Sequence, residues 1–303
     1  LYTDGAWSIP GTGSPAGVNP MTITGVSVLQ GQWTAREEPV ITTYYSYKSG
    51  NWNSAGTWTT DPSGTLSVGP SVPDETDRVV ILNGRTVTTT ANGETVLSVQ
   101  INEGGTLDLG NYTSHNFTVL RGKGLLRLST SLFPSGNLAD FVAAGGGTVE
   151  YYNSSGFTFS QLEYNNLIIN HSSTAVTATL TGHMIINGDL TVRNGVLRIN
   201  DGSSTDRSIY VGGDVLIQSS GSIGLGTGNA NHRFTVNGDF TNQGTVRLTN
   251  QTTPSYTSTP WNGRADLVFN NATADQSLLC LGQTDLYRIE IDKGIDKTFV
   301  LNI

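Results

Sequence analysis

The sequence predicts an all-β solenoid, in which short strands wind into stacked coils. Three observations predict this fold: a composition rich in glycine and poor in charge, a Gly-Asp unit that recurs at a constant interval, and a second recurring element in which glycine precedes alternating apolar residues. All three are typical of strands joined by tight turns and not of helices.

The composition disfavours helices. The chain has 303 residues, of which 37 are Gly and 13% are charged, whereas soluble domains usually have about 7% Gly and about 25% charged residues. Gly, Thr, Ser and Asn are poor helix formers, but Thr suits strands and Gly and Asn suit sharp corners. The best helix candidate is residues 138–144, which three consecutive glycines terminate.

A four-residue unit recurs three times at a constant interval. Its copies are Asn187-Gly188-Asp189-Leu190, Gly212-Gly213-Asp214-Val215 and Asn237-Gly238-Asp239-Phe240. The aspartates lie 25 residues apart both times, and each copy follows a short apolar strand. A period of this length indicates one coil of a solenoid.

A second element consists of a glycine followed by alternating apolar residues. It begins at Gly105, Gly124, Gly147, Gly195, Gly221 and Gly244, with intervals of 19, 23, 48, 26 and 23 residues. The interval of 48 spans about two coils, because residues 166–170 supply another strand inside it. One such coil cannot bury its own apolar side chains, so the coils must stack on one another.

The first strands of the series are expected over residues 78–82 and 86–88, joined by Asn83-Gly84. Asn-Gly is a strong hairpin signal, so these two strands could pair as a hairpin. We favour successive sides of one coil, because the same spacing of strand, glycine turn and strand continues downstream.

Three regions are predicted. Residues 1–43 form an irregular N-terminal segment or linker, because several prolines occur there without the coil period. Residues 44–76 form an N-terminal cap, which a solenoid needs to protect its open edge. Residues 77–303 form the solenoid, and we expect the native protein to continue beyond Ile303, because the strand pattern is still running at that point.

The segment from Tyr47 to Trp58 contains Gly50-Asn51-Trp52 and Thr57-Trp58, followed by Pro73-Asp74, a valine-rich strand and Thr86-Val87-Thr88. This succession resembles large secreted, adhesin-like β-helix proteins of Bacteroidota that are exported by type IX secretion. The resemblance covers roughly residues 44–303 and is most specific in the first forty of them. It implies a right-handed parallel β-helix, a secreted or cell-surface location, and the type IX secretion machinery as a partner during export.

Because β-helices also carry polysaccharide lyases and hydrolases, we looked for catalytic groups, and none stands out. The best acidic candidates are Asp189, Asp214 and Asp239, which stacking would bring to about 4.8 Å from one another. Such a ladder could bind Ca²⁺. We favour a structural role in which each aspartate accepts hydrogen bonds from backbone N–H groups beside its turn, because these residues define the repeat.

Aromatic and histidine residues offer two further hypotheses. Trp52 and Trp58 could stack on sugar rings, or they could cover the apolar end of the first coil, which we favour. The four histidines show no metal-ligand spacing and are expected to be surface or turn residues.

We therefore predict a non-catalytic structural or adhesion module, a rigid β-helical part of a large surface protein, with no cofactor. The alternatives are a carbohydrate-active β-helix enzyme and a glycan-binding module. Surface glycans or other cell-surface proteins are the expected ligands. The net charge of −8 argues against nucleic acid as a partner, and no apolar stretch is long enough to span a membrane.

Overall fold

The computed structural model describes residues 2–3, 6–7, 40–200, 202–250 and 263–303. The chain divides into two compact units, Leu1–Ile41 and Thr42–Ile303. In the first unit, β1 (Tyr2–Thr3) and β2 (Ala6–Trp7) pair in antiparallel orientation. Most of the irregular segment expected over residues 1–43 lies outside the described residues.

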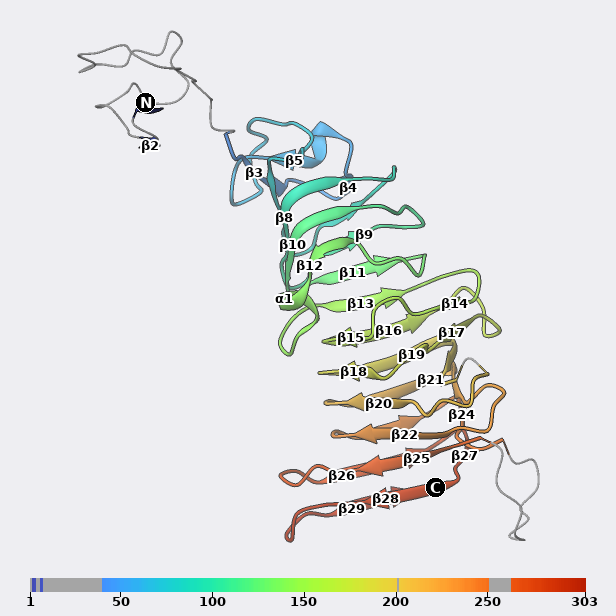
Figure 1. Cartoon of the computed structure of the whole chain (residues 1–303). Coiled ribbons are helices and arrows are strands. Elements are labelled where there is room, and N and C mark those ends of the chain that lie inside the picture. Colours follow the sequence, from blue (N-terminus) through green and yellow to red (C-terminus); the bar gives the residue numbers. More distant parts are fainter. Residues whose placement is uncertain (1, 4–5, 8–39, 201, 251–262) are drawn as a thin grey trace. The chain divides into compact units, whose positions relative to one another are not determined.

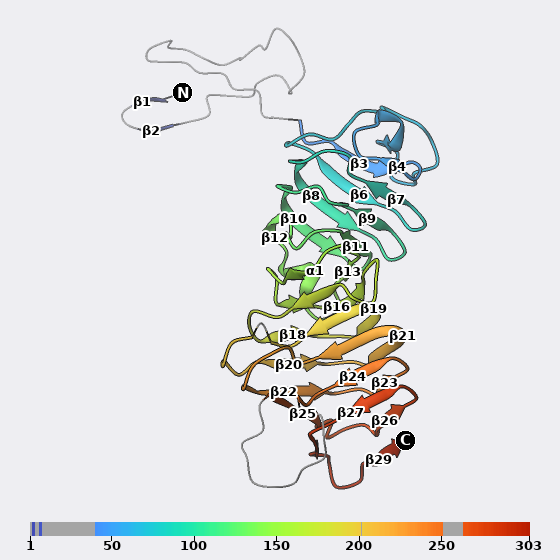
Figure 2. The same ribbon diagram turned by 90° about the vertical axis from the view of Figure 1, so that its right-hand side faces the viewer.

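The second unit is a parallel β-solenoid of about nine turns, as Figures 1 and 2 show from two sides. The prediction of an all-β parallel β-helix is therefore confirmed. Its strands form three sheets, which we call the long sheet, the N-terminal sheet and the C-terminal sheet.

The long sheet runs along the whole solenoid. In spatial order its strands are β4 (Gly50–Asn51), β7 (Thr86–Thr88), β9 (Thr106–Asp108), β11 (Leu125–Leu128), β13 (Thr148–Tyr151), β16 (Asn166–Asn170), β19 (Leu190–Arg198), β21 (Val215–Gly224), β23 (Phe240–Asn242), β26 (Gln276–Cys280) and β29 (Phe299–Asn302). Four short strands join its side: β14 (Phe157–Thr158), β17 (Thr177–Thr179), β24 (Thr245–Arg247) and β27 (Gln283–Asp285).

The two shorter sheets follow one another along the chain. The N-terminal sheet contains β5 (Trp58–Thr59), β3 (Thr43–Ser46), β6 (Arg78–Ile81), β8 (Thr95–Ile101), β10 (Asn116–Gly122) and β12 (Ser135–Asn137). The C-terminal sheet contains β15 (Glu163–Tyr164), β18 (Met184–Ile186), β20 (Ser208–Val211), β22 (Asn231–Val236), β25 (Arg264–Phe269) and β28 (Arg288–Ile291). The helix α1 (Ala139–Val142) contacts β10 of the first and β15 of the second.

The glycine run after α1 has a steric reason. The expected helix over residues 138–144 is present as this single turn. A Cβ on Gly147 would lie 2.2 Å from the ring of Phe141, and the Gly147 N–H donates to the Phe141 carbonyl. Only glycine fits where the chain leaves the helix so close to a buried ring.

The coil interpretation of residues 78–88 is confirmed. The strand β6 pairs in parallel with β3 and β8, whereas β7 pairs in parallel with β4 and β9 in the long sheet. The Asn83-Gly84 turn, with Gly84 at a φ of 71°, therefore joins two sheets and does not close a hairpin.

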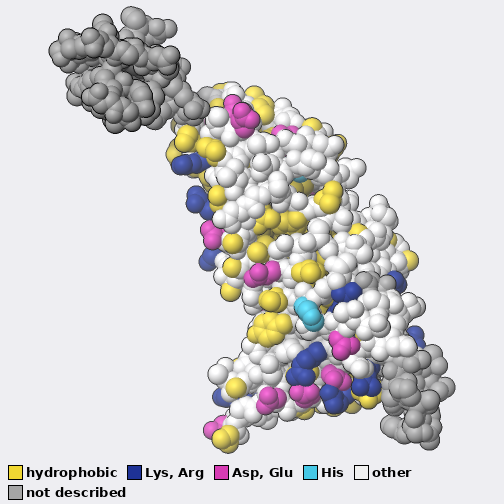
Figure 3. Space-filling model, viewed as in Figure 1, with side chains coloured by type: hydrophobic (Ala, Val, Ile, Leu, Met, Phe, Trp, Pro, Cys, Tyr) yellow, Lys and Arg dark blue, Asp and Glu magenta, His cyan; other side chains and the backbone are white. Residues whose placement is uncertain are grey.

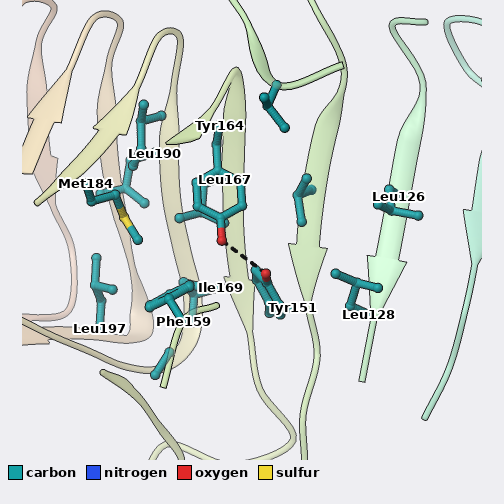
Figure 4. Packing of buried hydrophobic residues seen from close by; sticks show 14 of the residues in the cluster. Leu126, Leu128, Tyr151, Phe159, Tyr164, Leu167, Ile169, Met184, Leu190 and Leu197 are labelled. Carbon is teal, nitrogen blue, oxygen red and sulfur yellow. Dashed lines mark hydrogen bonds between the residues drawn. The ribbon is translucent and has the colours of Figure 1, made fainter. Parts of the chain in front are cut away.

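A continuous apolar column runs through the core because aligned strands place equivalent residues one above another. On the long sheet it contains Val87, Leu107, Leu126, Val149, Leu167, Leu190, Val215, Phe240, Leu278 and Leu301. All except the last, which belongs to the final coil, are buried. Figure 4 shows the middle of this core, where the Tyr151 and Tyr164 hydroxyls lie 3.0 Å apart.

Candidate functional site

Asp189, Asp214 and Asp239 lie at the same position of consecutive coils, on the outer face of the long sheet. The Asp214 backbone N–H donates to Asp189 Oδ1 at 2.8 Å, and the Asp239 N–H donates to Asp214 Oδ1 at the same distance. Asp239 Oδ1 accepts from the Ser277 N–H at 2.7 Å, and Asn166 Oδ1 accepts from the Asp189 N–H at 2.8 Å. We call this chain of bonds, from Asn166 to Ser277, the aspartate ladder.

The aspartate ladder uses one oxygen of each carboxylate to bind the next coil. All three aspartates are exposed, and none converges with two further acidic or imidazole side chains. Throughout the described ranges, no group of three or more His, Cys, Asp or Glu residues is arranged to hold a metal ion. The geometry is that of the structural role, in which a side-chain acceptor satisfies a backbone donor at a turn.

Replacing Asp214 separates the structural role from calcium binding. Asp214→Asn keeps an oxygen acceptor, so we expect an unchanged melting temperature, whereas Asp214→Ala should lower the free energy of unfolding by about 1 kcal/mol. Thermal melts with and without Ca²⁺ provide the measurement. If Ca²⁺ raises the melting temperature of the wild type and not of Asp214→Asn, the carboxylates bind calcium.

A second polar cluster lies on the same face, nearer the N-terminus. The register aligns Asp108 of β9, Arg127 of β11 and Glu150 of β13 in three consecutive coils. Arg127 donates to Asp108 from one guanidinium nitrogen and to Glu150 from another, both at 2.8 Å. We call these three residues, together with Tyr152 and Asn170, the Arg127 network.

The two acids of the Arg127 network are nearly buried and fully engaged. The Tyr152 hydroxyl donates to Asp108 Oδ1 at 2.6 Å, and Asn170 Nδ2 donates to Glu150 Oε1 at 2.7 Å. Arg127 also stacks over the Tyr152 ring, with its central carbon 4.3 Å from the ring centroid. A buried carboxylate is tolerated only with such partners, so the network ties three coils together.

The electrostatics agree with this structural role. Burial lowers the pKa of Arg127. The hydrogen bond to Glu150 and the negative charges of Glu150 and Asp108 outweigh this effect and hold the pKa above its ordinary value. Burial and the hydrogen bond to Asp108 raise the pKa of Tyr152. The guanidinium and the phenol therefore both hold their protons firmly, which does not suit a residue that must release a proton during catalysis.

The charged residues of the Arg127 network were not predicted, although the sequence contains a signal for them. Asp108, Arg127 and Glu150 are each the third residue after a repeat glycine, at Gly105, Gly124 and Gly147. Equivalent outward positions of adjacent coils with alternating charge indicate a cross-coil ion pair.

The structure corrects the hypothesis that Trp52 and Trp58 contact glycans. Both indoles are fully buried, with 0% exposure, and their rings meet edge to face at 5.2 Å. Trp58 Nε1 donates to the Trp52 carbonyl at 2.7 Å, and Trp52 stacks on Phe117. Neither ring offers a face to a sugar, because both fill the apolar end of the solenoid.

The prediction that the histidines are surface or turn residues is wrong for His232, which is buried within β22, whereas His115, His171 and His183 lie between strands. His115, His171 and His232 are buried, each with 2% exposure, and only His183 is exposed. The Nδ1 atoms of His115, His183 and His232 each accept a backbone N–H from an adjacent coil, at 3.2, 3.0 and 3.0 Å. An imidazole can therefore accept a backbone hydrogen bond from a neighbouring coil, as the ladder aspartates do. The spacing of the histidines in the sequence does not reveal this role.

The outer face of the C-terminal sheet carries exposed apolar side chains. Ile185 of β18 and Tyr210 of β20 are cross-strand partners, with 46% and 36% exposure. Figure 3 shows that acidic and basic side chains gather on this side towards the C-terminal end. There, Arg233 binds Glu290 at 2.8 Å, and Arg288 binds Asp266.

Comparison of the chain with protein-family models, with curated proteins and with solved structures found no match. In the parts of the chain that the structure describes, the longest α-helix, α1, has four residues, so no helix there could cross a membrane.

Proposed function

We propose that this chain is a non-catalytic structural module, a rigid β-helical part of a secreted or cell-surface adhesin-like protein. The observation that carries the proposal is how the acids on the outer face of the long sheet are used. Asp108, Glu150 and the three aspartates of the ladder all bond to neighbouring coils. A hydrolase or lyase needs acidic or basic groups that face a substrate, and these groups are committed to holding the rod together.

Export through the type IX route and attachment to the cell surface are part of the same proposal. The motifs between Tyr47 and Thr88, which resemble those of Bacteroidota surface proteins, support it. In a native host, disabling that secretion machinery should leave the protein inside the cell. Unchanged surface labelling in such a strain would contradict the export route.

Glycan binding without turnover is a second candidate function. The exposed Tyr210 ring beside Ile185 favours glycan binding. A tyrosine ring offers an apolar face and a polar hydroxyl, which suits a site that is partly apolar and partly hydrated. Tyr210→Ala should then abolish retention on a glycan array without changing the melting temperature.

Incubation of the purified chain with neutral and acidic polysaccharides tests the proposed function. We expect no new reducing ends and no unsaturated products. Adhesion of the same protein to surfaces is measured in parallel. Cleavage that Arg127→Met abolishes while the protein remains folded would replace the structural module with an enzyme whose site is the Arg127 network.

A further inference from the structure

One buried histidine is placed unlike the others. His171 directly follows β16, is 2% exposed, and neither of its ring nitrogens has a hydrogen-bond partner among the described residues. Its ring meets the edge of Phe157 with centroids 5.7 Å apart. A buried polar group without a partner is costly, and a buried charge would cost far more.

The corner around His171 contains two further polar atoms in the same situation. The side-chain oxygens of Asn153 and Asn194 are buried and lack a partner in the described part of the chain. Backbone bonds join the three positions: the His171 N–H donates to the Asn194 carbonyl, and the Ser172 N–H donates to the Asn153 carbonyl. Three consecutive coils thus meet at one corner, which we call the His171 corner.

The His171 corner is also tightly packed. A Cβ on Gly195 would lie 2.5 Å from Cδ2 of His171, and Gly195 has a φ of 93°. The pairing of β19 with β16 shifts register beside it. The ring therefore has no room to turn its nitrogens towards a new partner without the corner opening.

Among the residues that the structure describes, no ionised group compensates for a proton on this ring. The titratable and charged side chains on the elements packed against it are Glu150 and Tyr151 of β13, and Arg193 and Arg198 of β19. Burial is the single cause that lowers the pKa of His171, to about 4. Glu150 interacts on the outer face with Arg127 and Arg193 instead.

We propose that the His171 corner is an acid-sensitive joint, in which protonation of His171 expels its ring and detaches residues 171–176 from the neighbouring coils. The imidazolium can be hydrated only when the ring leaves the corner. When the ring leaves, Phe157 and β17 lose their packing. Because a lowered pKa means that the unfolded chain binds the proton more tightly, local stability is complete above pH 6.5 and is lost as the pH falls towards 4. Under acid conditions the rod then acquires a flexible joint at its middle.

An NMR titration of the imidazole resonances of the whole chain is the first test, and it needs no variant to fold. We expect His171 to titrate with a midpoint near pH 4, together with broadening of residues 171–176. A midpoint for His171 near the ordinary value of 6.5 would overturn the proposal.

Hydrogen exchange with a matched pair of variants is the second test. Near pH 4, with rates normalised to intrinsic exchange, amides 171–176 should exchange about tenfold faster in the wild type than in His171→Leu. The exposed His183→Leu should behave as the wild type. Local exchange is compared because burial also lowers the pKa of His115, which adds acid sensitivity elsewhere. Equal exchange at 171–176 in the wild type and His171→Leu would refute the joint.

Discussion

Replacing Trp58 with alanine is expected to lower the free energy of unfolding by about 3–5 kcal/mol, the usual cost of removing a fully buried indole. The loss should be large here because Trp58 packs on Trp52 and donates a buried hydrogen bond to its carbonyl. Denaturant unfolding of the purified chain measures it.

The Trp58→Ala substitution should destabilise the N-terminal end of the solenoid first. The strand β5, which begins with Trp58, pairs in antiparallel orientation with β3 and so ends the run of parallel strands on that side. We therefore expect amides in β3 and β6 to lose protection first. Tyr210→Ala, which truncates an exposed aromatic residue, is the control and should change stability by less than about 0.5 kcal/mol. A Trp58→Ala protein of wild-type stability that no longer bound glycans would restore the sugar-stacking hypothesis.

Replacing Arg127 with methionine should cost about 3 kcal/mol. Removing one partner of a buried ion pair leaves the other charge uncompensated, at a cost of about 3–5 kcal/mol, and the lower end applies because the Arg127 side chain is 30% exposed. Asp108 would lose its cation and Glu150 would keep only Arg193, at 3.7 Å, while methionine keeps most of the apolar stem. Thermal and denaturant melts give the measurement.

A double-mutant cycle shows whether the loss is electrostatic. Adding Glu150→Gln to Arg127→Met should recover part of the lost stability, because the neutral amide can still accept from Asn170. Arg198→Met, at an exposed position of the same sheet, is the matched control and should be nearly neutral. Additive losses at residues 127 and 150 would show that the two side chains contribute independently.

Several features could be predicted from local sequence alone. The 25-residue spacing of Asp189, Asp214 and Asp239 indicated that they occupy equivalent positions, and their backbones and side chains are hydrogen-bonded in series. The glycine elements at Gly105, Gly124 and Gly147 correctly predicted stacked coils, and the strands that follow them, β9, β11 and β13, are neighbours in the long sheet. These predictions succeeded because strand alternation and turn chemistry are properties of a few adjacent residues.

Other features could not be predicted in this way. The histidines were expected to be surface or turn residues, but the burial of His115, His171 and His232 was not predicted, because it depends on whether a residue at a corner points inward or outward. That direction is set by small register shifts, such as the one between β16 and β19 beside His171. No local pattern in the sequence records such a shift.

The sequence by itself determined that this chain forms a β-solenoid, because alternating apolar residues and regularly placed glycines allow few other ways of burying the core. Only the tertiary structure decided which outward-facing polar residues became neighbours. The repeat glycines align Asp108, Arg127 and Glu150. The coils differ in length, however, so further partners such as Tyr152 and Asn170 are selected by how the coils stack. That stacking is fixed by packing across the whole coil, which is why the bonds of Tyr152 and Asn170 within the Arg127 network, and the whole His171 corner, became visible only in three dimensions.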